Sequence, residues 1–94
     1  MSATAAIVFE AMMSPEQVYR LGVLMQEARS TRPAGVVAAA LLVEGEQVQL
    51  VAFWKDRATL DEYLATVDVP RGAELMRYAG VEPAWKIVDV REFA

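Results

Sequence analysis

The chain has 94 residues, a formal net charge of −4, and neither cysteine nor histidine. Its length fits one domain spanning residues 1–94, and the two missing residue types exclude disulfides and the common zinc sites. The acidic balance, with no run of basic residues, argues against nucleic-acid binding.

Hydrophobic side chains make up 55% of the chain, above the ~45–50% typical of globular domains on a count that also includes Gly. A domain of this size buries only about two-thirds of its unfolded surface. Small domains are usually stabilised further by disulfides, a metal or a partner subunit. Since cysteine and histidine are absent, the apolar surplus predicts a partner subunit.

The start of the chain, residues 1–4, has no basic segment leading into an apolar one, so we expect no signal peptide. No apolar run approaches the ~20 residues of a membrane span. The absence of cysteine fits a reducing compartment. The sequence therefore predicts a cytoplasmic protein that does not enter a membrane.

The first predicted elements are a strand over residues 4–13 and a helix that follows Ser14. Ser14 can cap the helix, Pro15 suits its first position, and Gln17 completes a capping box. Apolar residues then recur on one helical face: Val18, Leu21, Met25 and Ala28. The segment 30–33 ends the helix.

Two strands follow, over residues 35–44 and 47–54, joined by a short turn at Glu44-Gly45-Glu46. The first is an apolar run up to Val43, which is typical of a strand covered on both sides. The second alternates. One face carries Val48, Leu50, Ala52 and Trp54. The other carries Gln47, Gln49, Val51 and Phe53.

In the last third of the chain, the sequence predicts a helix that ends near Thr66 and is capped by Asp56 or Thr59. A second short helical piece covers residues 72–79, and Gly80 is a plausible stop. Residues 84–93 read as the final strand.

The order β-α-β-β-α-β is the ferredoxin-like plan of an α+β domain, an antiparallel sheet with its helices on one face. The other face would carry apolar side chains with nothing left in the chain to cover them. Exposing such a face is unfavourable at about 25 cal/mol per Å². We therefore expect a homodimer formed through that face.

The stretch Leu50–Leu64 (LVAFWKDRATLDEYL) resembles the centre of antibiotic-biosynthesis-monooxygenase-like domains, within the dimeric α+β barrel superfamily. In that family a strand ends in an aromatic residue followed by Trp. A polar turn and a helix with Ala-x-Leu come next, and an aromatic residue or His stands further along the helix. Here Phe53-Trp54 ends the strand, Ala58-Thr59-Leu60 lies in the helix, and Tyr63 occupies the last position.

The resemblance implies a homodimer and a pocket between sheet and helices in each subunit. Known members oxidise quinols or aromatic polyketides without a cofactor, degrade haem, or have no assigned activity. Quinol-oxidising relatives commonly carry His where Tyr63 stands, and haem-degrading relatives use a His ligand. Because this chain has no His, haem degradation is disfavoured, and we expect no haem, flavin or metal cofactor.

Three residues are candidates for a site. Trp54, at the end of a strand, suits stacking on a planar ligand, or simply core packing. Tyr63, in an apolar helical stripe, suits a hydrogen bond to a ligand, or a core position with its hydroxyl at the rim. Arg77, on the short helical piece, suits stabilisation of an oxyanion, or a solvated surface position.

Three further polar residues carry weaker hypotheses. Gln49 faces away from Trp54 and could bond across a dimer interface or face solvent on an edge strand. Asp89 and Glu10 could serve as a general base if buried in a cavity, although a solvated carboxylate is commoner.

Two functions from different classes follow. The first is a cofactor-free monooxygenase acting on a small planar aromatic or quinol-like compound, which Trp54 would orient, Tyr63 would hydrogen-bond and Arg77 would stabilise as an anion. The second is a non-catalytic dimeric module that binds a small hydrophobic or aromatic ligand, or a partner. The fold alone cannot choose between them. A dry cavity holding Trp54, Tyr63 and a third polar group would favour the first, and a filled interior the second.

Overall fold

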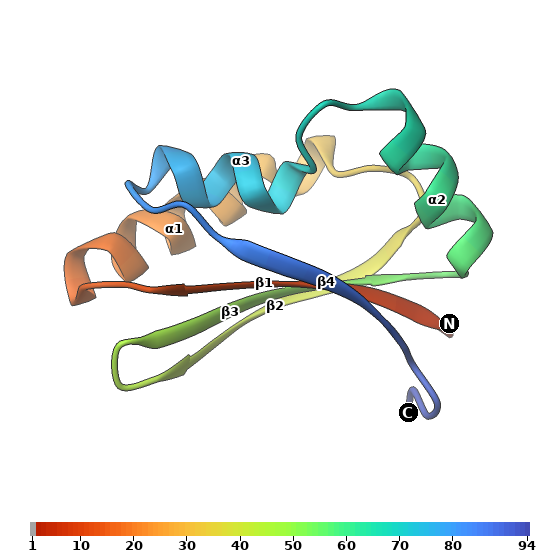
Figure 1. Cartoon of the computed structure of the whole chain (residues 1–94), viewed down its shortest axis with the longest axis horizontal. Helices are drawn as coiled ribbons and strands as arrows, with labels where there is room; N and C mark the ends of the chain where they lie inside the picture. Colours follow the sequence, from red (N-terminus) through yellow and green to blue (C-terminus); the bar gives the residue numbers. More distant parts are fainter. Residues whose placement is uncertain (1) are drawn as a thin grey trace.

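The computed structural model describes residues 2–94, which form a sheet of four strands with every helix on the same side (Figure 1). This is the predicted ferredoxin-like α+β fold. The elements in chain order are β1 (Ala5–Met12), α1 (Pro15–Ala28), the short 3-10 helix η1 (Arg29–Thr31), β2 (Val36–Glu44), β3 (Gln47–Trp54), α2 (Arg57–Thr66), α3 (Arg71–Tyr78) and β4 (Ala84–Asp89).

The strands lie in the order β2-β3-β1-β4, and every neighbouring pair is antiparallel. In the centre, Ile7 of β1 pairs with Ala52 of β3 and with Ile87 of β4. Strand alternation then sends Ile7 toward the helices and its neighbour Val8 to the opposite face. The helix-covered face contains the main core, whose largest fully buried side chains are Phe9, Met13, Leu21, Leu60, Met76 and Val48.

The opposite face, which we call the open face, is partly covered by the chain itself. Strand β4 ends at Asp89, so the prediction of a strand reaching residue 93 was wrong. Its only partner, β1, begins at Ala5, which pairs with Asp89, and one further bond joins Val90 N–H to Thr4 O. The chain beyond then bends beneath the sheet (Figure 1).

The tail packs on a second, smaller apolar cluster. The ring centroid of Phe93 lies 5.3 Å from that of Phe53, which belongs to the cluster around Val8 and Val51. The expectation that nothing in the chain covers this face was therefore wrong at that end of the sheet. Val8 and Val51 are only 8% and 7% exposed in the single chain.

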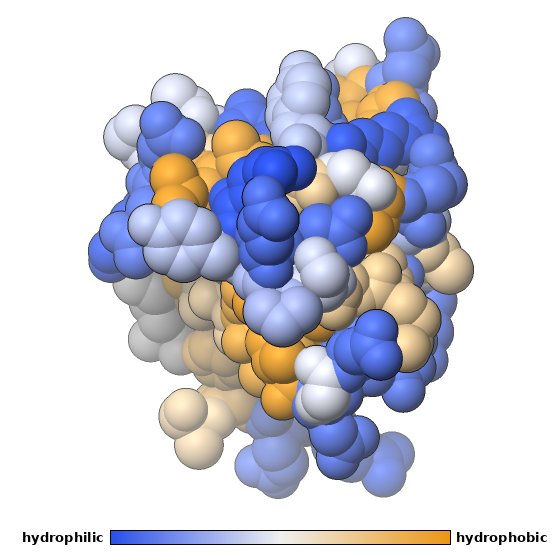
Figure 2. Space-filling model, turned by 90° about the vertical axis from the view of Figure 1, so that its left-hand side faces the viewer, coloured by the Kyte–Doolittle hydropathy of each residue, from blue (hydrophilic) through white to orange (hydrophobic). Residues whose placement is uncertain are grey.

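Exposed apolar side chains gather at the other end of the sheet. Figure 2 looks at the end where the β2–β3 turn and the start of α1 lie. Hydrophilic residues cover most of it, and apolar residues gather below the middle of the view, at the level of the sheet. Exposed large apolar residues of these strand ends are Met12, Leu42 and Val43.

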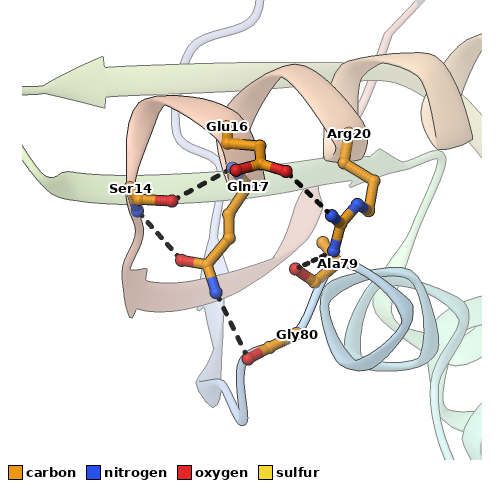
Figure 3. A network of polar contacts seen from close by, with 6 residues as sticks. All are labelled: Ser14, Glu16, Gln17, Arg20, Ala79 and Gly80. Atoms are coloured by element: carbon orange, nitrogen blue, oxygen red, sulfur yellow. Dashed lines mark hydrogen bonds and ion pairs between the residues drawn. The ribbon is translucent and has the colours of Figure 1, made fainter.

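Helices α1 and α3 are joined at one end by a polar network (Figure 3). The predicted capping box is present: Ser14 Oγ accepts from Gln17 N–H at 3.2 Å, and Gln17 Oε1 accepts from Ser14 N–H at 2.9 Å. Gln17 also donates to Gly80 O, and Arg20 donates to Ala79 O, each at 3.4 Å. The start of α1 is thereby tied to the end of α3.

Gly80 is the helix stop that the sequence predicts. Its φ of +104° is a left-handed conformation that favours glycine, and the adjoining N–H groups bond back to Arg77 O and Met76 O. The ordered end allows α3 to lie beside α1 above the sheet (Figure 1). Among residues 2–94, no helix is long and apolar enough to cross a membrane.

Candidate functional site

A cavity of about 630 Å³ lies between the sheet and the helices and is partly open to solvent. Its size is within the range of small-molecule sites, about 300–1,000 Å³. Most of its wall is apolar and includes Ile7, Phe9, Met25, Leu41, Leu50 and Leu75. Two of the three predicted site residues, Trp54 and Tyr63, also line it.

Trp54 forms part of the cavity wall at the end of β3. Its side chain is buried, and its ring lies 5.0 Å from that of Tyr63, centroid to centroid, at an angle of 37°. The back of the indole lies against Gly35, where an added Cβ would stand 2.6 Å from Trp54 Cε3. Glycine at position 35 therefore lets β2 approach the ring closely and fixes its position.

The indole N–H of Trp54 has no hydrogen-bond partner in the described structure. An unbonded buried donor is costly, because it has lost its water without gaining an acceptor. The position of Trp54 is thus maintained by packing on Tyr63 and Gly35, despite an unsatisfied polar atom.

Tyr63 joins α2 to α3. Its hydroxyl oxygen accepts a hydrogen bond from Arg71 N–H at 2.9 Å. Pro70, the residue that precedes α3, has no side-chain cap to offer, so the phenol of Tyr63 satisfies one of the free N–H groups at that helix start. The hydroxyl proton remains available to donate to an acceptor in the cavity.

Tyr63 reaches the cavity because only a short turn, Lys55-Asp56, separates Trp54 from the start of α2. Of the two caps that the sequence allows, Asp56 is the one used: its carboxylate accepts from Thr59 N–H at 2.7 Å. Hydrogen bonds from the side chain and backbone of Thr59 lower the pKa of Asp56 below its ordinary value. The ionised carboxylate thus starts α2 at the turn that brings Tyr63 back over Trp54.

The charged residues that line the cavity are all arginines, namely Arg29, Arg32 and Arg71. Arg71 crosses from α3 to η1, where its guanidinium donates to Thr31 Oγ1 at 3.2 Å and to Thr31 O at 3.3 Å. Sequence reasoning missed this role for Arg71. The available signal was its spacing, since Arg71 and Leu75, four residues apart on one helical face, both line the cavity.

Arg77, the third predicted site residue, lies outside the cavity lining. It makes a two-pronged ion pair with Glu82, with Nε 3.0 Å from Oε1 and Nη2 2.9 Å from Oε2. Both side chains are largely exposed. The structure therefore brings Trp54 and Tyr63 together and leaves Arg77 on the surface.

The remaining polar candidates also lie away from the cavity. Gln49 Nε2 donates to Glu10 Oε1 at 3.0 Å on the open face, and Lys86 Nζ lies 3.8 Å from the same oxygen. The edge-strand alternative for Gln49 was wrong, because β3 lies between β2 and β1. Asp89 is exposed at the end of β4.

In the described part of the chain, no three His, Cys, Asp or Glu side chains are grouped to hold a metal ion. The cavity instead offers aromatic faces, a phenol, the amide of Gln26 and guanidinium groups. Such a set can stack on a planar molecule, hydrogen-bond to its oxygens and stabilise negative charge on it.

No protein-family model and no curated protein matches the sequence, but several solved structures are similar in fold. A monooxygenase from the gene ActVA-Orf6 of Streptomyces coelicolor, solved with nanaomycin D, is 16% identical, with a TM-score of 0.68 over 98% of this chain and 91% of that one. A variant of SnoaB, a cofactor-independent oxygenase from Streptomyces nogalater, is 18% identical, with a TM-score of 0.66 over 98% and 97%.

A protein of unknown function from Nitrosomonas europaea is similar to the same degree, at 18% identity and a TM-score of 0.67 over 98% of this chain and 93% of that one. At such identities the likeness shows a shared fold. The chain has the fold of antibiotic-biosynthesis-monooxygenase-like proteins over nearly its whole length, as the motif around Trp54 implies.

Proposed function

We propose that this protein is a cofactor-independent monooxygenase acting on a small planar aromatic or quinol-like compound bound in the cavity. The observation that carries the proposal is the cavity itself, where Trp54, Tyr63 and Arg71 line a largely apolar wall. Two solved structures of this fold are described as a cofactor-independent oxygenase and a monooxygenase.

Each residue has a role in this reaction. Trp54 and the apolar wall orient the flat substrate and exclude water from it. The hydroxyl of Tyr63, which already accepts from Arg71 N–H, donates its proton to a substrate oxygen. The guanidinium of Arg71 stabilises the substrate anion, the role that the sequence suggested for Arg77.

The substrate supplies all of the reducing electrons. A carbon beside the aromatic ring loses a proton to solvent water at the open side of the cavity, which gives a delocalised anion that reacts with dioxygen. One oxygen atom enters the product as a carbonyl, the other leaves as water, and a methylene carbon has become C=O. The protein needs to bind the substrate, stabilise its anion and admit dioxygen.

Oxygen consumption with anthrone tests this proposal, because its methylene carbon can become the carbonyl of anthraquinone. We expect uptake of one dioxygen per anthrone at a rate above that without protein. Arg71→Gln should slow the reaction by about tenfold or more, and Arg77→Gln on the same helix should leave the rate unchanged. Equal rates with and without protein, for anthrone and for related quinols, would contradict the proposal.

The second candidate is a non-catalytic module that binds the same kind of ligand. The absence of histidine favours it, and so does the engagement of the Tyr63 hydroxyl as an acceptor at the start of α3. This alternative predicts that anthrone binds and that oxygen uptake is no faster than without protein. Binding and turnover measured on one sample distinguish the two functions.

The protein is also proposed to act as a homodimer through the open face. Support comes from Met12 and Leu42, which are exposed on this face toward the β2–β3 turn. The polar group of Glu10, Gln49 and Lys86 lies on the same face and can bond across a two-fold axis. Light scattering should give twice the chain mass of 10.4 kDa, and a monomer at micromolar concentration would contradict this.

A further inference from the structure

The charged residues around the cavity are of one sign. The chain has thirteen acidic and nine basic side chains, yet Arg29, Arg32 and Arg71 line the cavity, and among residues 2–94 no Asp or Glu does. Although the protein is acidic overall, the charged side chains that line this cavity are all positive. Fields of one sign in a cleft with apolar walls attract ligands of the opposite sign.

Arginines away from the cavity differ from those that line it in their ion pairs. Away from the cavity, Arg20, Arg57 and Arg77 each pair with a carboxylate, at 3.4, 2.9 and 2.9 Å. At the cavity, Arg71 has only a longer contact of 3.9 Å to Glu74. Within the described residues, neither Arg29 nor Arg32 lies in an ion pair. Among the described residues, the charges of Arg29 and Arg32 are therefore not neutralised by any ion pair, and that of Arg71 is met only by the longer contact to Glu74.

These charges are concentrated on one side of the site. Arg71 bonds to Thr31, and Arg29 and Arg32 flank Thr31 in and after η1. The sheet contributes the apolar wall, with Ile7 and Leu50 among its members. A ligand that satisfies both parts is flat and apolar at one end and anionic at the other.

We propose that the natural ligand is an aromatic organic acid, whose carboxylate or similar compact oxyanion binds beside η1 to Arg29 and Arg32, next to Arg71. Guanidinium groups match planar oxyanions with paired hydrogen bonds. The inference rests on the proposed function, since it takes the cavity as the binding site, and adds a permanent charge to the ligand. In this arrangement Arg71 remains near the reacting ring and the acid is anchored beyond it.

The test compares anthracene-2-carboxylate with anthracene-2-carboxamide, which have the same shape and differ in charge. Both resist oxidation, so calorimetry at neutral pH reports binding alone. We expect the carboxylate to bind about tenfold more tightly at low salt, because exposed charge-assisted hydrogen bonds retain part of their strength. Added salt should shrink this preference through screening.

The double variant Arg29→Gln/Arg32→Gln should reduce the preference to about threefold or less while leaving carboxamide affinity unchanged. Arg91→Gln is the matched control, because Arg91 is exposed and lies outside the cavity lining. It should leave both affinities as they are. Circular dichroism should show the same fold for all three proteins.

Each other outcome overturns a stated part of the account. If the unmodified protein binds the two probes equally well, the proposal that the ligand is an acid is wrong, and the cavity remains a site for aromatic molecules. A preference that survives the double variant removes Arg29 and Arg32 as the anchor. The same result with lowered stability would mean that they only offset the C-terminal dipole of α1. If neither probe binds, the proposed function fails together with the inference.

Discussion

The helix-covered face and the open face of the sheet are built by the same strands, and both are largely apolar. On β1, Ile7 lines the cavity while the next residue, Val8, belongs to the closed cluster beneath the sheet. On β3, Trp54 faces the cavity while Phe53 packs against the tail residue Phe93. The helix-covered face encloses a cavity of about 630 Å³. On the open face, side chains pack closely around Val8 and Val51, and the pocket beside Glu10 and Lys86 is much smaller, at about 140 Å³.

The two faces also differ in whether their charged side chains have partners of opposite charge. On the open face, Glu10 bonds to Gln49 and lies near Lys86, so the polar group balances itself. At the cavity, Arg29 and Arg32 lack any such partner among the described residues. Apolar composition alone would not separate the faces. The unbalanced charge beside an unfilled volume is the reason for proposing that the cavity is the functional side.

The largest difference between the faces should come from truncating two consecutive residues. Trp54→Ala should lower the free energy of unfolding by about 3–5 kcal/mol, because a buried indole is lost and the cavity grows. Phe53→Ala, on a half-buried ring, should cost only about 1–2 kcal/mol. Urea denaturation followed by circular dichroism measures both.

Any part of the Phe53→Ala loss that depends on protein concentration would report the proposed dimer. Equal losses for Trp54→Ala and Phe53→Ala at every concentration would mean that the two faces are packed alike.

Glycine substitutions probe the space behind and inside the cavity. Gly35→Ala should destabilise the protein by roughly 1–3 kcal/mol, because its methyl group collides with the back of Trp54 and overpacks that wall. Gly22→Ala is the matched substitution: Gly22 lines the cavity from α1, and an added Cβ meets nothing within 4 Å.

Gly22→Ala should therefore stabilise α1 by roughly 0.5–1 kcal/mol. Thermal unfolding gives both values. A stabilising Gly35→Ala would show that Trp54 has room to move and is not fixed by β2.

Removing the Tyr63 hydroxyl acts on the cavity face alone. Tyr63→Phe should cost about 0.5–1.5 kcal/mol of stability, because the N–H of Arg71 at the start of α3 loses its acceptor. Hydrogen exchange should show the matching local effect, a faster exchanging Arg71 amide with Val8 and Val51 amides unchanged. Unchanged exchange at Arg71 would remove Tyr63 as the cap of α3.

The smallest effect concerns pH at the start of α2. The pKa of Asp56 is lowered in the folded chain, chiefly by its hydrogen bonds to Thr59. Its contribution to stability is therefore complete above the ordinary aspartate pKa of about 3.9 and is lost as pH falls through the lower folded value. Urea titrations of Asp56→Ala and the unmodified protein should converge in acid. If the difference in unfolding free energy between the two proteins grew as pH fell, the pKa of Asp56 would be raised in the folded chain rather than lowered.

Much of the framework could be predicted from local chemistry. Ser14, Pro15 and Gln17 define the start of α1 by contacts within four residues, and Gly80 ends α3 through its own backbone. These signals do not depend on the rest of the fold. The pairing of Trp54 with Tyr63 was also foreseeable, since a short capped turn between strand and helix brings them together.

Features that depend on contacts between distant parts of the chain could not be predicted from the sequence. The strand pattern continues through Val90 and Phe93, yet β4 ends at Asp89, opposite the first residue of β1. After one further bond from Val90 N–H to Thr4 O, the chain turns away and Phe93 packs on Phe53. Whether Arg71 or Arg77 lines the cavity depends on the direction of α3, which is set by Gln17, Arg20 and the Tyr63 hydroxyl. No local pattern reports those contacts.

The central claim, that the helix-covered face binds a planar aromatic ligand and the open face does not, can be tested by methyl NMR. Titration with anthracene-2-carboxylate should shift the methyl signals of Ile7 and Leu50 and give intermolecular contacts to them. Val8 and Val51, on the opposite face of the same two strands, should stay in place. Shifts confined to Val8 and Val51, or no shift at either pair up to millimolar ligand, would contradict the account.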